Sequence, residues 1–350
     1  MERKFGFGIV GAGTISDIHA LAIRSIPNAK LVGVYSINKG KSQAWADKND
    51  CTCYDSLEKM LANDEINIVC ICTPSGIHLD PAIKSFAAGK HCVIEKPLEV
   101  TLEKCDTIIE SAEKAGLKTS VIFPSRFYEA STQVKKALDE KRFGELVLGD
   151  AYVKWSRSEA YYNSAAWRGT WQLDGGGALM NQGIHSVDLL QWYMGQVESV
   201  QSVSANIKHK GIEVEDTIVS TLKFSNGALG TIECSTAIFP GALKRIEIMG
   251  TSGTAILEES NLVKWQFDKE AAEDEIITKN MSGGQVSHGG VSNPADISFK
   301  GHQRQLEDMI LSIEKGKKPL IDAIEGRKSV EIVLAMYESA RTGKKVFLSK

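Results

Sequence analysis

The chain carries no strong charge of either sign, and it has no apolar run long enough to span a bilayer. Its 350 residues include 41 Lys and Arg against 44 Asp and Glu, for a net charge of −3. This balance favours neither nucleic acid nor an anionic membrane surface as a partner. The amino terminus lacks the layout of a signal peptide, so we expect a cytoplasmic protein.

The sequence also lacks the cysteine spacings that are typical of metal and redox motifs. Cys51 and Cys53 are separated by one residue, as are Cys70 and Cys72, whereas zinc and thioredoxin motifs use longer spacings. We therefore predict no metal site, and reduced thiols in the cytoplasm. No internal repeat or low-complexity tract is present, and the length suffices for two domains.

A glycine-rich turn follows the first apolar stretch. Residues 5–10 predict a strand, residues 11–16 a dinucleotide-binding loop with Ser16 in place of the third glycine, and the residues after them a helix through about Ser25. Gly11 allows the tight turn, and Gly13 lets the backbone approach a pyrophosphate, which the first N–H groups of the helix then bind. The cofactor contacts predicted here are Gly11, Gly13, Thr14 and Ile15.

The turn after the second predicted strand, residues 30–35, bears on the choice of cofactor. An NAD-specific fold normally ends this strand with an acid that binds the ribose 2′-hydroxyl. Here the turn has no acid but offers donors from Ser36, Asn38 and Lys39. The pattern favours NADP, while a solvated turn that accepts NAD is the alternative.

Further strands and helices alternate up to Phe123. The predicted strands are 67–72, 92–94 and 119–123, and the predicted helices are 78–88 and 102–115. Such alternation is typical of a doubly wound parallel sheet with helices on both faces. We therefore predict a Rossmann domain over residues 1–123.

The pattern changes in residues 124–350, where strands follow one another with few helices between them. The predicted strands are 146–155, 200–207, 217–224, 230–237 and 245–250, and the predicted helices are 131–140, 303–315 and 326–342. Asn226-Gly227 predicts a hairpin turn, and the polar residues 271–293 predict an exposed excursion. This order favours a second α/β domain with a large, mostly antiparallel open sheet.

Glu95-Lys96-Pro97 directly follows the apolar strand 92–94. Ligands of open α/β sheets bind beyond the carboxyl ends of the strands, so Lys96 would stand at the rim of a cleft. A partly desolvated lysine has a lowered pKa and can exchange protons near neutral pH. The alternative is an ordinary strand end with a solvated Glu–Lys pair.

A second candidate segment runs from Trp167 to Asp188. Asn181, His185 and Asp188 recur at helical spacing, which predicts that they share one face of a helix. Three glycines at 175–177 allow the close approach of a ligand or of another backbone. The alternative is a packed helix with a buried, hydrogen-bonded histidine.

These segments together resemble the Gfo/Idh/MocA family, the glucose–fructose oxidoreductase and inositol dehydrogenase group. The resemblance covers nearly the whole chain and rests on these motifs: the glycine loop, Thr73-Pro74 with His78, 89–91, 95–97, Arg126-Phe127, Trp167-Arg168, 175–177, Asn181 and His185. It implies reversible oxidation of a hydroxyl group of a sugar, glycoside, sugar acid or cyclitol by NAD(P). It also implies a homodimer or homotetramer formed through the open sheet, and a C-terminal helix, about 326–342, that packs back on the Rossmann domain.

The resemblance also implies roles for individual residues. Lys96 matches the catalytic lysine and His185 the histidine that assists proton transfer, while members often have Asp where this chain has Asn181. Because an amide cannot relay a proton, we expect Lys96 to be the main acid/base group, His185 a secondary one and Asn181 a substrate binder. The other expected substrate contacts are Arg157, Tyr162, Trp167 and Arg168, with His302 at the rim. The other expected cofactor contacts are Thr73, Pro74, His78, Glu95, Lys96 and Arg126.

Two other functions are compatible with the same residues. A redox-neutral glycosidase would oxidise its substrate transiently and return the cofactor unchanged. A non-catalytic dinucleotide-binding regulator would need no proton acceptor, so Lys96 and His185 argue against it. The aromatic residues Tyr161, Tyr162, Trp167 and Trp171 could stack on a sugar ring or pack in the protein core.

Overall fold

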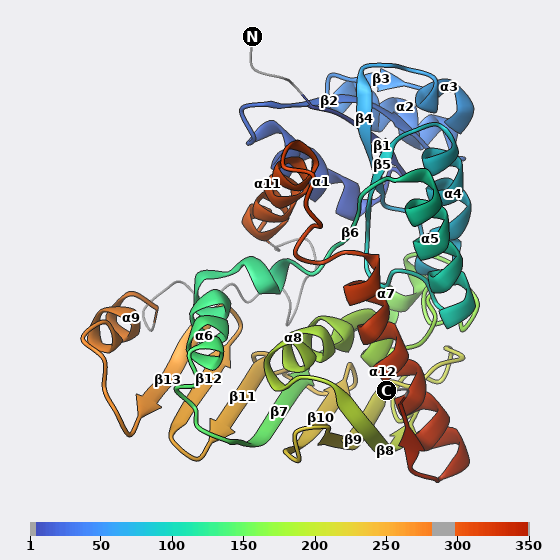
Figure 1. The fold of residues 1–350 in the computed structure, drawn as a ribbon. Coiled ribbons are helices and arrows are strands. Elements are labelled where there is room, and N and C mark those ends of the chain that lie inside the picture. The colour runs from blue at the N-terminus through green and yellow to red at the C-terminus, as the bar shows by residue number, and fades with distance from the viewer. Residues whose placement is uncertain (1–4, 282–297, 349–350) are drawn as a thin grey trace. The chain divides into compact units, whose positions relative to one another are not determined.

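The computed structural model describes residues 5–281 and 298–348 (Figure 1). The chain divides into two compact units, residues 1–124 with 298–330 and residues 125–297 with 331–350. The last helix, α12 (Ala323–Thr342), begins in the first unit and ends in the second.

The first unit contains a six-stranded parallel sheet in the order β3-β2-β1-β4-β5-β6. The strands are β1 (Phe5–Val10), β2 (Ala29–Tyr35), β3 (Thr52–Cys53), β4 (Ile66–Ile71), β5 (His91–Ile94) and β6 (Thr119–Val121). Strands β1 and β4 lie next to each other although β2 and β3 come between them in sequence, so the strand order reverses beside β1. This arrangement is the predicted Rossmann fold, and it puts the loops after β1 and β4 at one sheet edge.

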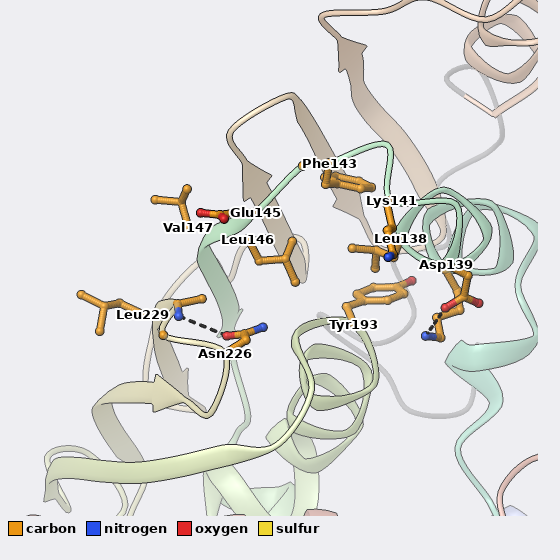
Figure 2. Close-up of a pocket in the computed structure, with 14 residues that line it drawn as sticks. Leu138, Asp139, Lys141, Phe143, Glu145, Leu146, Val147, Tyr193, Asn226 and Leu229 are labelled. Atoms are coloured by element: carbon orange, nitrogen blue, oxygen red, sulfur yellow. Dashed lines mark hydrogen bonds and ion pairs between the residues drawn. The ribbon is translucent and has the colours of Figure 1, made fainter.

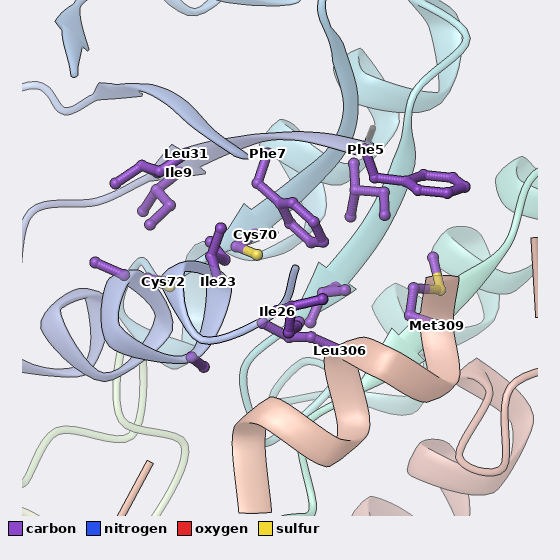
Figure 3. Close-up of a cluster of buried hydrophobic side chains, with 14 of the residues drawn as sticks. Phe5, Phe7, Ile9, Ile23, Ile26, Leu31, Cys70, Cys72, Leu306 and Met309 are labelled. Atoms are coloured by element: carbon purple, nitrogen blue, oxygen red, sulfur yellow. The ribbon is translucent and has the colours of Figure 1, made fainter. Parts of the chain in front are cut away.

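The helices of this unit are α1 (Thr14–Arg24), α2 (Lys39–Lys48), α3 (Leu57–Leu61), α4 (Leu79–Ala87), α5 (Leu102–Ala115) and α11 (Lys300–Glu314). One buried cluster joins β1 and α1 to α11, with Phe7, Ile23 and Leu306 among its members (Figure 3). The burial of Leu306 and Met309 explains why residues far along the chain belong to this unit, because apolar area removed from water stabilises the contact.

The second unit is built on an eight-stranded sheet in the order β13-β12-β11-β7-β10-β9-β8-β14. Its strands are β7 (Leu146–Lys154), β8 (Val197–Ala205), β9 (Thr217–Phe224), β10 (Leu229–Ser235), β11 (Arg245–Gly250), β12 (Gly253–Glu258), β13 (Asn261–Phe267) and β14 (Val346–Phe347). Only β7 and β10 pair in parallel, so the sheet is mostly antiparallel, as predicted.

Three strands of this sheet, β12, β13 and β14, were not predicted. Most residues of β13 are exposed or half-buried, so the strand lacks the clear apolar alternation that marks β9. The turn between β12 and β13 has Glu259 at φ 52°, without the Asn-Gly signal that correctly predicted the turn between β9 and β10.

The helical segments of this unit are α6 (Glu129–Asp139), α7 (Glu159–Asn163), a π-helical turn (Ala178–Gly183), α8 (Ile184–Met194) and α9 (Asp274–Met281). Helix α8 packs on β7 and β11. The predicted excursion 271–293 contains α9, and its part from residue 282 lies outside the described residues. Within the described ranges, no helix has the length and apolarity needed to cross a membrane.

Candidate active site

The loop between β1 and α1 has the form that a bound pyrophosphate requires. Gly11 has φ +106°, and a Cβ there would lie 2.6 Å from the carbonyl oxygen of Cys72. A Cβ on Gly13 would meet nothing within 4 Å, and α1 begins after Gly13 without a side-chain cap. Ser16, in place of the third glycine, folds back to donate to the Gly13 carbonyl at 2.5 Å. The open space and the uncapped N–H groups fit a dinucleotide phosphate.

The turn after β2 holds the residues that were expected to select the cofactor. Asn38 caps α2, since its side-chain oxygen accepts a hydrogen bond from the Lys41 N–H at 3.0 Å. Ser36 is half-buried and Lys39 is exposed. The cap uses only the Asn38 oxygen as an acceptor, so the Asn38 NH2, Ser36 and Lys39 remain as donors for a 2′-phosphate.

His78 links the loops that follow β4 and β5. Its ring is fully buried, with Nε2 3.0 Å from the carbonyl oxygen of Thr73 and Nδ1 2.9 Å from that of Pro97. Both contacts are to the main chain, so the structure places His78 as a bridge that holds the Thr73 loop to the Lys96–Pro97 segment. Thr73 and Pro74 themselves are half-buried.

Lys96 follows a carboxylate that two histidines surround. Glu95 Oε1 lies 2.8 Å from His19 Nε2 and 3.5 Å from His302 Nε2, and Glu95 Oε2 accepts the Lys96 N–H at 3.3 Å. Burial alone would raise the pKa of Glu95, but hydrogen bonds and charge from the two histidines hold it below its usual range. Burial lowers the pKa of His19, while its hydrogen bond with Glu95 and the charge of Glu95 act in the opposite direction.

The same three side chains are the one group of described residues whose donor atoms could hold a metal ion, since they all lie within 4.8 Å of one another. The 2.8 Å between His19 and Glu95 is a hydrogen-bond distance. In this arrangement Glu95 fixes the main chain at Lys96, whose side chain is half-buried. His302, which was expected at the pocket rim, is 3% exposed and lies beside Glu95.

In the second unit, the three glycines before α8 accommodate other parts of the protein. A Cβ on Gly177 would lie 1.7 Å from the Glu215 carbonyl oxygen, and one on Gly176 would lie 2.2 Å from the Tyr337 hydroxyl. The Glu215 carboxylate accepts from the N–H groups of Gly177 and Leu179 at 3.0 and 2.8 Å. Glu215 therefore anchors the start of the helical segment that carries Asn181 and His185.

Asn181 lies in the π-helical turn, and its amide donates to the buried carboxylate of Asp174 at 2.6 Å. His185 lies in the first turn of α8 and is half-buried. Asp188 is fully buried and binds Arg126 through both carboxylate oxygens, at 2.7 and 2.8 Å. Arg126, which was expected to contact the cofactor, is thus 1% exposed and held by Asp188 within the second unit.

Tyr161 is the centre of the other predicted substrate residues. Its hydroxyl accepts from Arg168 Nη1 at 2.7 Å and from Gln182 Nε2 at 2.8 Å. Arg157 donates from Nη2 to Gln182 Oε1 at 3.1 Å, and Gln182 also donates to Asn181. The structure therefore brings Arg157, Arg168 and Asn181 into one network.

The predicted aromatic residues differ in exposure. Tyr162 is buried, and its hydroxyl pairs with Thr236 at 2.7 Å, which supports core packing for this ring. Trp167 is half-buried and lies against the Arg168 guanidinium, 4.7 Å from its carbon. Trp171 is 47% exposed and donates from Nε1 to the Glu213 carbonyl.

Two surface pockets of the second unit lie apart from most of these residues. One, of about 790 Å³, is bordered by the end of α6, Phe143–Val147 and the β9–β10 turn, and it contains none of the predicted site residues (Figure 2). The other, of about 640 Å³, lies beside Trp171, Glu215 and Tyr337. Glu215, which anchors the helical segment, lines this pocket, whereas Asn181 and His185 do not.

Sequence reasoning missed several polar residues of these networks, namely His19, Asp174, Gln182, Glu215 and Tyr337. Glu215 follows the buried Val214 but precedes Asp216 and Thr217, so the local sequence gave no clear signal of its burial. Asp174 directly precedes the three glycines, and its position there was a usable signal.

Comparison with known proteins agrees with this fold. An oxidoreductase family with an NAD-binding Rossmann fold matches residues 5–123, and the GFO/IDH/MocA C-terminal domain matches residues 131–256. The chain belongs to the Gfo/Idh/MocA family. It is an NAD(P)-dependent oxidoreductase that acts on CH–OH groups.

Solved structures of two WlbA dehydrogenases, each in complex with NADH and UDP-GlcNAcA, are similar over the whole chain. The enzyme from Bordetella pertussis is 32% identical with a TM-score of 0.90, covering 100% of this chain and 99% of that one. The enzyme from Chromobacterium violaceum is 34% identical with a TM-score of 0.89, covering 100% and 97%. The D-glucoside 3-dehydrogenase of Escherichia coli is 26% identical, with 97% of this chain and 96% of the relative aligned.

Proposed function

We propose that this dehydrogenase oxidises a ring hydroxyl of a UDP-linked sugar acid. The observation that carries the proposal is the likeness, along the whole chain, to two dehydrogenases whose structures contain NADH and UDP-GlcNAcA, at 32% and 34% identity. The redox-neutral glycosidase and the regulator gain no support from these relatives.

In this proposal Lys96 is the proton acceptor. When bound, NAD(P) supplies the hydride acceptor, and the hydroxyl proton must leave to a group of the protein. The neutral Lys96 amine takes it on Nζ, while Glu95, held by His19 and His302, fixes the Lys96 main chain. Asn181, held by Asp174, orients the substrate hydroxyl, and His185 is a second acid/base group.

The choice between NAD and NADP and the assembly of subunits belong to the same proposal. The acid-free turn at Ser36 and Lys39 supports NADP, while both WlbA dehydrogenases hold NADH. We further propose an oligomer through the second unit's sheet, where Val203 and Val219 of β8 and β9 are 70% and 42% exposed. A cytoplasmic location rests on the seven cysteines, each a free thiol.

The proposal is tested with the purified protein and either cofactor. The substrates are UDP-GlcNAcA, UDP-GlcNAc, a neutral glucoside and an inositol, and both reduced cofactor and products are measured. We expect reduced cofactor to accumulate with UDP-GlcNAcA in equal amount to oxidised sugar. Oxidation of the glucoside or inositol without any reaction of UDP-GlcNAcA would overturn the substrate assignment. Release of free sugar with no net reduction would indicate the glycosidase.

A further inference from the structure

Two guanidinium groups lie against one tyrosine ring in the second unit. The guanidinium carbon of Arg168 is 4.3 Å from the centroid of Tyr161, and that of Arg157 is 5.3 Å from it. A third cation is near, because Lys208 donates from Nζ to the Arg157 carbonyl oxygen at 3.2 Å. The aromatic face and the Tyr161 hydroxyl hold Arg168 in place from two directions.

This gathering of three cations is only partly balanced by Asp174, the buried acid of the same network. Arg157 is 3% exposed, and burial lowers its pKa. The nearby positive charge of Arg168 also lowers it. Within residues 5–281 and 298–348, neither Arg168 nor Lys208 forms an ion pair. Asp174 is the buried acid of the network, and its oxygens accept from Asn181 and from the Gly169 N–H. Like charges brought together in a poorly solvated place are unfavourable unless an opposite charge joins them.

Arg168 has the geometry to receive that charge. Its Nε donates to Ser164 at 3.1 Å and its Nη1 to Tyr161 at 2.7 Å. Those bonds orient the planar guanidinium group of Arg168. The residue is half-buried, so the guanidinium remains accessible to solvent. A fixed guanidinium binds a carboxylate or phosphate through paired, charge-assisted hydrogen bonds, which a flexible ammonium cannot reproduce.

The cation cluster is continuous with the residue expected to orient the reacting hydroxyl. Tyr161 accepts from Gln182, and Gln182 donates in turn to Asn181 at 3.2 Å. We propose that Arg168, seated on Tyr161 and backed by Arg157, binds an acidic group of the substrate and selects charged sugar nucleotides over neutral sugars. The inference rests on the proposed function, and its ligand is an anionic oxygen group, either the sugar carboxylate or the diphosphate.

The test is calorimetric binding of UDP-GlcNAcA and UDP-GlcNAc to protein saturated with NADH. Loss of a charge-assisted hydrogen bond costs about 1.5–3 kcal/mol, so Arg168→Gln should weaken UDP-GlcNAcA binding roughly 10- to 100-fold with NADH affinity unchanged. If the carboxylate is the ligand, UDP-GlcNAc binding stays as in wild type. If the diphosphate is the ligand, both nucleotides weaken equally. Arg168→Lys should restore only part of the affinity.

Arg341→Gln is the matched control, because Arg341 is an exposed arginine of the same unit and its loss should change neither affinity. Unchanged binding of both nucleotides by Arg168→Gln would overturn the inference. If wild type binds neither nucleotide, the proposed function fails instead. The inference is then tested by comparing the binding of glucuronate and of glucose to wild type and to Arg168→Gln. It requires that the variant lose the preference for glucuronate and keep the affinity for glucose. If Arg168→Gln does not fold, Arg168→Lys replaces it in each comparison.

Discussion

The side-chain amide of Asn181 donates a 2.6 Å hydrogen bond to Asp174, a carboxylate that is 2% exposed. The family resemblance implies that an acid often stands at position 181, and here an acid instead stands seven residues earlier and contacts the amide. The other Asp174 oxygen accepts from the Gly169 N–H, which keeps the carboxylate in place. A carboxyl group therefore lies beside Asn181 although Asn181 itself is an amide.

Asn181→Asp should place two carboxylates against each other. The pair would share a proton, which raises its pKa, so the variant should lose stability as pH rises, by about 1–3 kcal/mol at neutral pH. The new charge should also shift the pH profile of activity upward if it raises the pKa of His185. Urea unfolding and pH–rate profiles measure the two effects.

The exchanged double variant Asp174→Asn with Asn181→Asp is the control and should regain stability. If activity appeared only in the Asp variants, the native site would not be catalytic.

Lys96→Met tests the proton acceptor. The change keeps the apolar stem but removes the amine, so kcat should fall about 10²- to 10⁴-fold. Cofactor affinity should survive, because the loop at Gly11 and Gly13 binds the pyrophosphate. Steady-state kinetics and cofactor titration measure both quantities, and Lys114→Met, at an exposed position of α5, is the control. Full activity in Lys96→Met would move the proton transfer to another group, with His185 the next to test.

Ser36→Asp tests the choice of cofactor. We predict that the unmodified protein binds NADP more tightly than NAD, because the turn after β2 has no acid and offers Ser36 and Lys39. An aspartate at position 36 repels a 2′-phosphate and accepts from a 2′-hydroxyl, so the order should reverse. Calorimetry with each cofactor decides the matter. Equal or tighter NAD binding by the unmodified protein contradicts the prediction.

Glu215 should make stability depend on pH near neutrality. Burial raises its pKa from 4.5 to about 7, against hydrogen bonds from Leu179, Tyr337 and Gly177. The pKa of Glu215 is higher in the folded protein than in the unfolded chain. Its contribution to the free energy of unfolding is therefore complete below the unfolded-state pKa and is lost as pH rises through the folded-state pKa. The stability of wild type relative to Glu215→Gln should therefore fall by roughly 2 kcal/mol between about pH 5 and pH 8. Denaturant unfolding of both proteins measures it, and a pH-independent difference would refute the shift.

Much of the fold could be predicted because its signals are local. The buried run of β4 and the alternation of β9 each appear within one short stretch of sequence. Strand β13 carries a weaker signal, since only Asn261, Leu262 and Phe267 are buried, and its place depends on pairing with β12. Pairing partners are set by the whole sheet, so they cannot be read from one segment.

The candidate site shows the same division. Lys96 could be proposed from its position after a strand, and Asn181 and His185 from their spacing and the family resemblance. The three glycines left two alternatives open, a ligand or another backbone. The structure favours the second, because the Glu215 backbone and the Tyr337 hydroxyl occupy the space that Cβ atoms would need. Both residues lie far from the glycines in sequence.

The sequence by itself determined the family, the two kinds of sheet and the glycine loop, because short-range spacing and periodicity encode these features. Only the tertiary structure decided which charged groups meet. Arg126 and Asp188 are 62 residues apart, and His19 and Glu95 are 76 apart, yet each pair is buried and in direct contact. A buried charge must find a partner, but which partner it finds depends on how the helices and strands pack. The partners of Glu95, Asn181 and Arg168 were decided at that level.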